Sequence, residues 1–211
     1  VKRTTTWFTS KPCVPISAVQ HAAGRIEILS SKSAYLTTGD LGFRRINQVT
    51  ARGYLGGVFK ISKNKIVQLS SGHRNPQGII KVGNNLYISE HGPRGGDEIN
   101  VPEAGKNYGW PLATHGVNYS MLAIPEAKGE TLEGTEPPHH VWEKSPAISG
   151  MAFYDAERFP AWQHNLFIGA LSGQALIRLQ LDGDKIVHEE RLLESLNARV
   201  RDVRQGPDGY I

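Results

Sequence analysis

Short runs in which apolar and polar residues alternate dominate the pattern along this chain. Residues 24–29, 57–61 and 176–181 repeat with the period of two that is typical of a half-buried β-strand. The pattern holds no long amphipathic helix; we expect a helical turn within residues 155–165, which Pro160 keeps short. Turn residues separate the runs, and they stand at residues 63–64, 83–85, 182–184 and 207–209. With 23 Gly and 12 Pro, the sequence predicts an all-β protein with many tight turns.

A repeat emerges when the turns are aligned. An aromatic residue followed by an aliphatic one recurs at Tyr35, Tyr87, Phe167 and Tyr210, with spacings of 52, 80 and 43 residues. Two of these spacings lie near the period of a β-propeller blade, about 40–50 residues, and the third fits one blade plus an insertion. The insertion is residues 105–140, which are rich in Gly, Pro and Asn. We therefore expect residues 1–211 to form a partial β-propeller domain of about four blades with one long inserted loop.

Candidate functional residues occupy equivalent places in this repeat. His21, Arg74, Ser149 and Arg201 lie 14, 13, 18 and 9 residues before the four aromatic positions. Residues 39–40, 90–93 and 170–172 follow the first three aromatic positions directly. If the blades superpose, all these segments reach one face around the propeller axis and build one site. The alternative is that Gly- and Pro-rich loops simply join the strands there.

Composition and charge narrow the function classes. The net charge is +4, but Lys and Arg are scattered, which favours a solvated basic surface over nucleic-acid binding. No apolar run approaches the about 18 residues that span a membrane. A single cysteine, Cys13, excludes an intrachain disulfide. The chain opens at Val1 without Met or a leader-like segment and stops at Ile211 in an expected strand, so we expect N-terminal blades and the last strand to be missing from it.

Three local motifs have residue types suited to a redox cofactor and a metal. Residues 72–78 carry Arg74, whose fork of donors suits a carboxylate or quinone oxygen, and Asn75, which both donates and accepts. Residues 89–100 alternate carboxylates with glycines that leave backbone carbonyls accessible, and such oxygen-rich loops suit calcium. Residues 105–111 form an aromatic turn that either covers a ligand or packs on the sheet. His139 and His140 are expected to be a solvent-facing loop pair.

The co-linear set of motifs resembles a known family. Residues 74–78, 90–93, 97–100, 107–111 and 199–203 appear in the order found in the soluble aldose sugar dehydrogenases that depend on pyrroloquinoline quinone (PQQ), within the broader glucose/sorbosone dehydrogenase family. The resemblance is close from about His21 to the end of the chain. It implies a six-bladed β-propeller that holds PQQ and calcium on one face.

The resemblance also implies a role for each matching residue. His21, in the segment His-Ala-Ala-Gly-Arg, corresponds to the general base. The carbonyls of Gly92 and Pro93 would bind the calcium that lies against PQQ, and Glu98 and Tyr108 match a second calcium position. The positions that match PQQ contacts, besides Gly92 and Pro93, are Arg74, Asn75, Tyr119, Ala170, Leu171, Ser172, Arg199, Val200 and Arg201.

The implied reaction is oxidation of an aldose at C1 to a lactone, with His21 as base and hydride transfer to PQQ. A quinone or other acceptor would reoxidise the cofactor, in a periplasmic or secreted protein that is a monomer or weak dimer. Two departures from the family pattern are Ala22-Ala23 after the base and Ser172, where a lysine commonly reaches a PQQ oxygen. They leave open a non-catalytic calcium-binding propeller. A lactonase-like hydrolytic propeller is the other alternative, but we find no set of Asn and Asp ligands for it.

Overall fold

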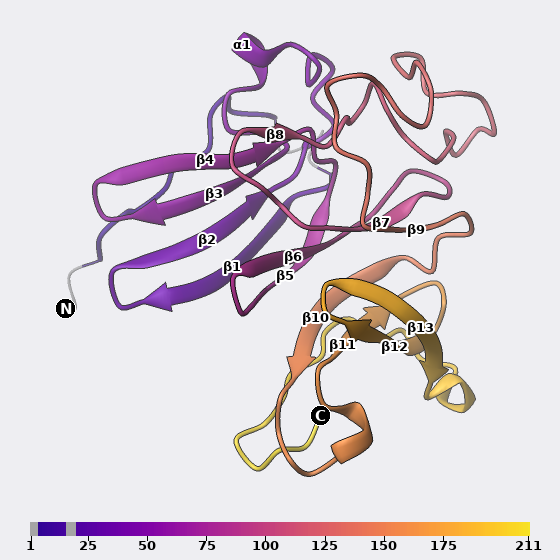
Figure 1. Ribbon diagram of the computed structural model, residues 1–211. Coiled ribbons are helices and arrows are strands. Elements are labelled where there is room, and N and C mark those ends of the chain that lie inside the picture. Colours follow the sequence, from indigo (N-terminus) through magenta and orange to yellow (C-terminus); the bar gives the residue numbers. More distant parts are fainter. Residues whose placement is uncertain (1–3, 16–19) are drawn as a thin grey trace. The chain divides into compact units, whose positions relative to one another are not determined.

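The computed structural model describes residues 4–15 and 20–211, and its regular secondary structure is almost entirely β-strand (Figure 1). The chain clusters into two compact units. The first comprises Val1–Pro76, Pro102–Thr114 and Leu122–Pro137, and the second comprises Gln77–Val101, His115–Met121 and Pro138–Ile211. No helix in the described part of the chain is long and apolar enough to cross a membrane.

The first unit contains one five-stranded sheet in the order β1-β2-β3-β4-β8. Its first four strands are antiparallel neighbours in chain order, and the short β8 pairs with β4 in parallel. Two-residue turns join β1 to β2 and β3 to β4, because Ser30 pairs with Ser33 and Ser62 pairs with Lys65. The elements of this unit are β1 (Ala23–Ser30), β2 (Ser33–Thr38), α1 (Val49–Arg52), β3 (Gly57–Ser62), β4 (Lys65–Ser71) and β8 (Lys106–Asn107).

Aromatic side chains cover the apolar face of this sheet. Leu36 and Phe59 are buried in its core, and Trp7 and Phe8, from the segment before β1, pack against them. The rings of Tyr54 and Phe59 meet edge to face with 5.5 Å between their centroids. Burial of such side chains contributes about 1.5–3 kcal/mol each, so this face holds the unit together.

The second unit contains two four-stranded sheets, ordered β5-β6-β7-β9 and β10-β11-β12-β13. Their facing sides share one core that includes Tyr87 and Ile99 from the first sheet and Leu166, Ile168 and Ile177 from the second. The strands are β5 (Pro76–Val82), β6 (Asn85–Glu90), β7 (Asp97–Asn100), β9 (His140–Trp142), β10 (Ile148–Tyr154), β11 (Asn165–Ala170), β12 (Ala175–Asp182) and β13 (Lys185–Leu192). Two single turns of 3₁₀ helix complete the unit, η2 (Pro160–Trp162) and η3 (Glu194–Leu196).

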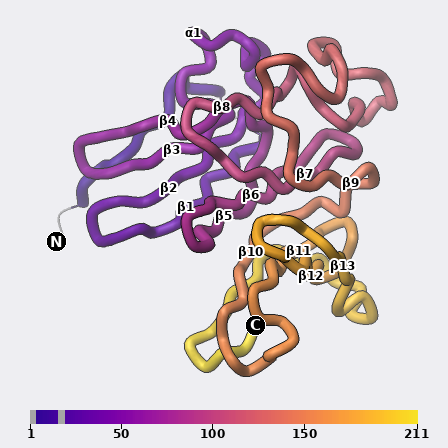
Figure 2. The backbone as a smooth tube through the Cα atoms, viewed as in Figure 1, coloured from indigo at the N-terminus to yellow at the C-terminus, as the bar shows by residue number. Residues whose placement is uncertain are grey.

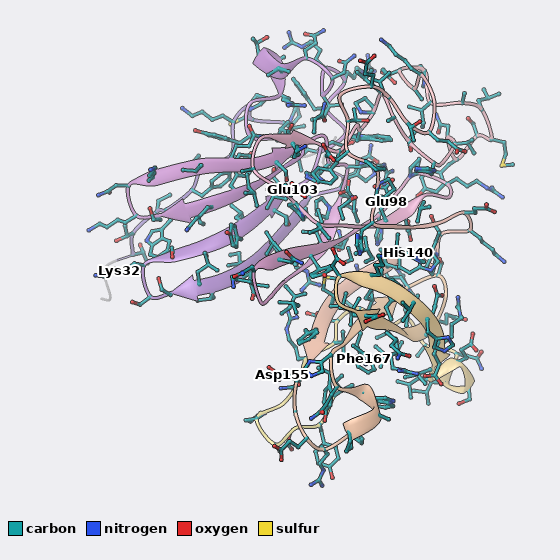
Figure 3. The ribbon with its side chains drawn as sticks, in the orientation of Figure 1. Lys32, Glu98, Glu103, His140, Asp155 and Phe167 are labelled. Carbon is teal, nitrogen blue, oxygen red and sulfur yellow. The ribbon has the colours of Figure 1, made fainter. Side chains whose placement is uncertain are left out.

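The strand β11 is buried on both of its faces. All six of its residues are buried, and successive side chains point to opposite sides. Leu166 and Ile168 join the core between the two sheets, whereas Phe167, labelled in Figure 3, packs on the other side with Tyr154 and Val203. A continuous apolar run of this length is the pattern of a fully buried central strand.

The predicted strands and turns are confirmed in both units. Residues 24–29, 57–61 and 176–181 lie in β1, β3 and β12, and residues 160–162 form the expected short helical turn. The aromatic positions Tyr35, Tyr87 and Phe167 all lie in the second strand of their sheets, β2, β6 and β11. The expected strand at Tyr210 is wrong, because its carbonyl instead accepts the Gly206 N–H in a turn (2.8 Å).

Residues 108–139 contain neither a strand nor a helix, and Figure 2 shows them as a long loop between β8 and β9. The expectation that His140 is a solvent-facing loop residue is wrong. His140 begins β9, and its ring meets the Trp142 ring edge-on at 4.3 Å. Its Nε2 lies 3.5 Å from Oε2 of Glu189 on β13, so the side chain belongs to a contact between the edges of the two sheets.

Candidate active site

Three loop segments of the first unit meet at the ends of their strands and bring His21, Asp40 and Arg74 together. His21 precedes β1, Asp40 follows β2, and Arg74 precedes β5. The Asp40 N–H donates to the Arg74 carbonyl (2.8 Å), and the Gly39 N–H donates to the Ala22 carbonyl (3.4 Å). The backbone itself therefore fixes these three side chains beside one another.

Gly39 is required for this approach. A Cβ placed on Gly39 would lie 1.5 Å from the carbonyl oxygen of His21, which no side chain can tolerate. His21 itself adopts a positive φ of 54°, a backbone conformation that few non-glycine residues adopt. Unusual backbone at one histidine, held by its neighbours, is a frequent property of functional sites.

The two ring nitrogens of His21 have different partners. Nδ1 lies 2.8 Å from Oδ1 of Asp40, and Nε2 lies 2.9 Å from Nη2 of Arg74. Arginine can only donate, so Nε2 must be the acceptor, and Nδ1 must carry the proton that it donates to Asp40. The geometry therefore selects one neutral tautomer, in which the Nε2 lone pair is directed away from the carboxylate and accepts from Arg74.

Asp40 is held in turn by two further donors. Its Oδ1 accepts the Gly42 N–H (2.8 Å), and its Oδ2 accepts the indole N–H of Trp110 (2.8 Å). The Asp40 side chain is only 5% exposed, whereas the His21 side chain is 18% exposed and can meet a ligand. This is the arrangement of a base oriented by a buried carboxylate.

Sequence reasoning did not assign a role to Asp40 or Trp110. Both were visible: Asp40 follows the first aromatic position of the repeat, and Trp110 belongs to the aromatic turn of residues 105–111. Asn75, which was assigned, is buried, and its Oδ1 accepts the N–H of Ala23 at 3.2 Å. It thereby ties the start of β1 to the segment that carries Arg74.

Tyr108 has a structural role in the same unit. Its ring stacks on the fully buried His73 with 4.9 Å between centroids, and its hydroxyl accepts the Glu103 N–H at 3.2 Å. Burial raises the pKa of the Tyr108 hydroxyl to about 12, so it stays protonated at neutral pH. A metal contact from this residue would therefore come from its carbonyl rather than from a phenolate.

In the second unit, four of the predicted residues line one pocket of about 450 Å³: Gly92, Pro93, Tyr119 and Ser172. A pocket of this volume suits a small molecule. Other lining residues include Arg94, Lys144 and Asp97. Ala170 and Leu171 do not line it; their side chains are buried, and the Ala170 carbonyl accepts the N–H of Val200 at 3.2 Å.

Asp97 shapes the wall of this pocket. Its carboxylate accepts the N–H groups of Gly92 and Ile148, each at 3.0 Å, and so joins the loop after β6 to the start of β10. A Cβ on Gly92 would lie 2.1 Å from the Gly96 carbonyl oxygen, so the loop folds tightly on itself. Burial raises the pKa of Asp97, although the positive charge of His91 and the hydrogen bonds oppose this effect.

Glu98, labelled in Figure 3, lies on β7 next to the buried Asp97 and is paired across the sheet with the buried Glu90. Burial, followed by repulsion from Glu90 and Asp97, raises the pKa of Glu98 to about 8, while a hydrogen bond from Asn100 to Oε2 (3.0 Å) acts in the opposite direction. A cation would relieve this repulsion. Within residues 4–15 and 20–211 no three His, Cys, Asp or Glu side chains converge as a metal cluster. Calcium binding would therefore need backbone carbonyl ligands as well, such as those of the loop between β6 and β7.

Arg199, Val200 and Arg201 form a segment beside the same sheet. The Arg201 carbonyl accepts the Gly150 N–H (3.1 Å), and a Cβ on Gly169 would lie 2.5 Å from the Val200 carbonyl oxygen. Both arginine side chains are exposed, and neither lines the pocket. The segment is thus fixed through its backbone while its cationic side chains remain accessible.

Comparisons with known proteins show the family to which the chain belongs. The family model "Glucose / Sorbosone dehydrogenase" matches residues 2–211. The aldose sugar dehydrogenase YliI of Escherichia coli (strain K12) is 57% identical over 144 residues, which are 67% of this chain and 39% of that protein.

Two solved structures are similar over most of the chain. The soluble aldose sugar dehydrogenase (Asd) of Escherichia coli in the apo-form has a TM-score of 0.82 at 43% identity, over 89% of this chain and 59% of that one. The PQQ-bound form of the aldose sugar dehydrogenase of Streptomyces coelicolor has a TM-score of 0.66 at 26% identity, over 85% of this chain and 51% of that one. The chain thus spans between 39% and 59% of the length of these three proteins. It belongs to the glucose/sorbosone dehydrogenase family.

Proposed function

We propose that the protein carrying this chain oxidises aldose sugars at C1 to lactones, with PQQ as the electron acceptor and calcium beside it. The observation that carries this proposal is the His21–Asp40 pair, in which Nδ1 is fixed to the carboxylate at 2.8 Å and Nε2 is left as the basic atom. The fold class and family, with relatives named as aldose sugar dehydrogenases, support it.

His21 is the general base of the proposed reaction. Its Nε2 would accept the proton of the anomeric hydroxyl, and Asp40 would stabilise the imidazolium that forms. Proton removal of this kind contributes about 10²–10⁴-fold to a rate. Arg74 has to release Nε2 before the hydroxyl can approach, because the single lone pair serves one donor at a time.

The residues of the chain fit an acidic, planar quinone. The pocket of the second unit is lined by the cations Arg94 and Lys144 and by Tyr119. Arg74, in the first unit, is proposed as a further PQQ contact from the family resemblance. Bound PQQ would supply a quinone carbonyl that accepts the hydride from C1 of the sugar. Ser172 cannot provide the charge of a lysine, and its Oγ donates to the Ser145 carbonyl at 3.2 Å, so we assign this charge to Lys144.

Calcium would be held by the carbonyls of Gly92 and Pro93, with a second position at Glu98 and Tyr108. The tight loop around Gly92 and the raised pKa of Glu98 support an oxygen-rich cation site. Further cofactor contacts are proposed for Asn75, for Ala170 and Leu171 through their backbones, and for the segment Arg199, Val200 and Arg201. We further propose that the three sheets are blades of a six-bladed propeller.

Reconstitution of the full-length protein with PQQ and Ca²⁺ tests the proposal. We expect a quinone absorbance band on the protein and reduction of an artificial dye with several aldoses. Bound quinone without turnover would favour the non-catalytic propeller, which the serine at position 172 already makes the main alternative. Failure to bind PQQ, with calcium still bound, would reject the dehydrogenase.

A further inference from the structure

We propose that Trp110 is a positioning residue for the His21 base, acting on both of the groups that hold its ring. This inference rests on the proposed function, in which His21 is the base. It concerns a residue of the aromatic turn of residues 105–111, for which the motif pattern left open whether it covers a ligand or packs on the sheet.

The first action is through the indole N–H. It donates to Oδ2 of Asp40 at 2.8 Å, while Oδ1 of the same carboxylate faces His21 Nδ1 at 2.8 Å. A carboxylate can turn about its Cβ–Cγ bond, so a partner on one oxygen also fixes the direction of the other. Trp110 thereby keeps Oδ1 directed at the histidine, and the histidine in the tautomer with a proton on Nδ1.

The second action is through the face of the ring. The guanidinium carbon of Arg74 lies over the Trp110 ring, 5.3 Å from its centroid, which is within the range of a cation–π contact. The same guanidinium places Nη2 2.9 Å from His21 Nε2. One side chain therefore contacts the partner of each ring nitrogen, Asp40 on one side and Arg74 on the other.

The backbone around Trp110 makes this placement rigid. The Trp110 N–H donates to the Gly72 carbonyl at 2.9 Å, two residues before Arg74. A Cβ on Gly72 would lie 2.0 Å from Oδ1 of Asn107, so the aromatic turn lies directly against the segment that carries Arg74. The position of His21 thus depends on the start of the long loop between β8 and β9, although that loop lies far from His21 in the sequence.

The sharpest test removes the N–H and keeps an aromatic ring at position 110. In the PQQ- and calcium-loaded full-length protein, Trp110→Phe should lower kcat by about tenfold, the effect of losing a hydrogen bond to a charged group, with little change in the KM for the sugar. In the Asp40→Asn background the same change should lower kcat by less than about twofold, because the carboxylate through which the N–H acts is already absent. A full and additive loss in that background would overturn the proposal.

Trp142→Phe is the matched control. Trp142 also donates its indole N–H to a carboxylate at 2.8 Å, but that carboxylate is Glu189 on β13, whereas the carboxylate that contacts His21 is Asp40. We expect it to leave kcat unchanged. If both variants lower kcat equally, the loss reflects general stability and Trp110 has no positioning role.

A second readout needs no cofactor. In the unloaded protein at about pH 9, above the ordinary titration range of imidazole, ¹⁵N spectra assigned with His21→Asn should show His21 protonated at Nδ1. Trp110→Phe, but not Trp142→Phe, should move population to the Nε2-protonated form. If the tautomer of His21 is unchanged in Trp110→Phe, the inference is overturned even if the enzyme is active. If the tautomer changes but the loaded protein shows no turnover, only the proposed reaction is rejected. If the phenylalanine variant does not fold, 3-benzothienylalanine at position 110 keeps the ring size, removes the N–H and serves the same comparison.

Discussion

At the scale of single residues, the proposed chemistry depends on His21, because its two ring nitrogens have different partners. A histidine that has no partner can exchange its tautomers freely, and its ring can rotate away from a substrate. In this structure Nδ1 donates to Asp40, and Nε2 accepts a hydrogen bond from Arg74. In the proposed reaction, the His21 ring would therefore act as a base without first having to rotate.

Replacing His21 tests this assignment directly. We expect His21→Asn to lower kcat by about 10²–10⁴-fold, because the base is lost, while the affinity for PQQ changes little. Dye-reduction kinetics and a PQQ titration measure the two effects. His188→Asn, at an exposed position on β13, is the control and should retain full activity. Parallel losses of turnover and PQQ affinity would instead assign His21 a structural role.

At the scale of elements, the loops that end the strands carry the site, and glycine allows them to approach. The clearest case is Gly39, where an added Cβ would lie 1.5 Å from the His21 carbonyl oxygen. We expect Gly39→Ala to destabilise the protein by about 2–4 kcal/mol, because backbone rather than a flexible side chain has to move. Urea unfolding measures the change.

Gly105→Ala provides the matched comparison for that substitution. Gly105 has a φ of 79° but open space around it, so an alanine there should cost only about 1–2 kcal/mol for the left-handed backbone. Equal effects at both positions would mean that the approach at Gly39 is not tight.

A second contact between elements joins β9 to β13 and depends on pH. The side chain of His140, and to a smaller extent the Trp142 indole, lower the pKa of Glu189, against the opposing effect of burial. A carboxylate with a lowered pKa in the folded state stabilises the fold above its unfolded pKa and loses that contribution as pH falls through the folded value.

Glu189→Gln should therefore lower the free energy of unfolding at pH 7 by about 1 kcal/mol or less, as for partly exposed ion pairs. The difference from the unmodified protein should shrink as the pH is lowered below about 4.5, the ordinary range of a glutamate. Thermal unfolding of both proteins, measured from pH 7 to below about pH 4.5, gives the difference in stability and its change with pH. A difference that stays constant, or the same effect in Glu126→Gln on the exposed loop, would contradict the role of this contact.

At the scale of the whole molecule, the sequence predicted the strands well and the site incompletely, for a physical reason. Period-two alternation and turn residues are local signals, and they located β1, β3 and β12 and the shared second-strand position of Tyr35, Tyr87 and Phe167. The contact between Asp40 and Trp110 joins residues 70 positions apart. No local pattern encodes which of two distant polar groups will meet, because this depends on close backbone approaches such as that of Gly39.

Calcium should act on the stability of the whole protein, since a ligand that binds only the folded state stabilises it by mass action. At a free Ca²⁺ concentration of about 100 times its Kd, one site adds about 2.7 kcal/mol. The part of this increase that comes from Glu98 should disappear in Glu98→Gln, because bound Ca²⁺ would favour the ionised form of this carboxyl, whose pKa is raised to about 8, and an amide cannot ionise. Thermal unfolding of the full-length protein with Ca²⁺ and with a chelator measures both increments. Glu126→Gln should keep the complete calcium effect; if Glu98→Gln keeps it as well, calcium does not bind at Glu98, and the raised pKa of this side chain reflects burial and repulsion alone.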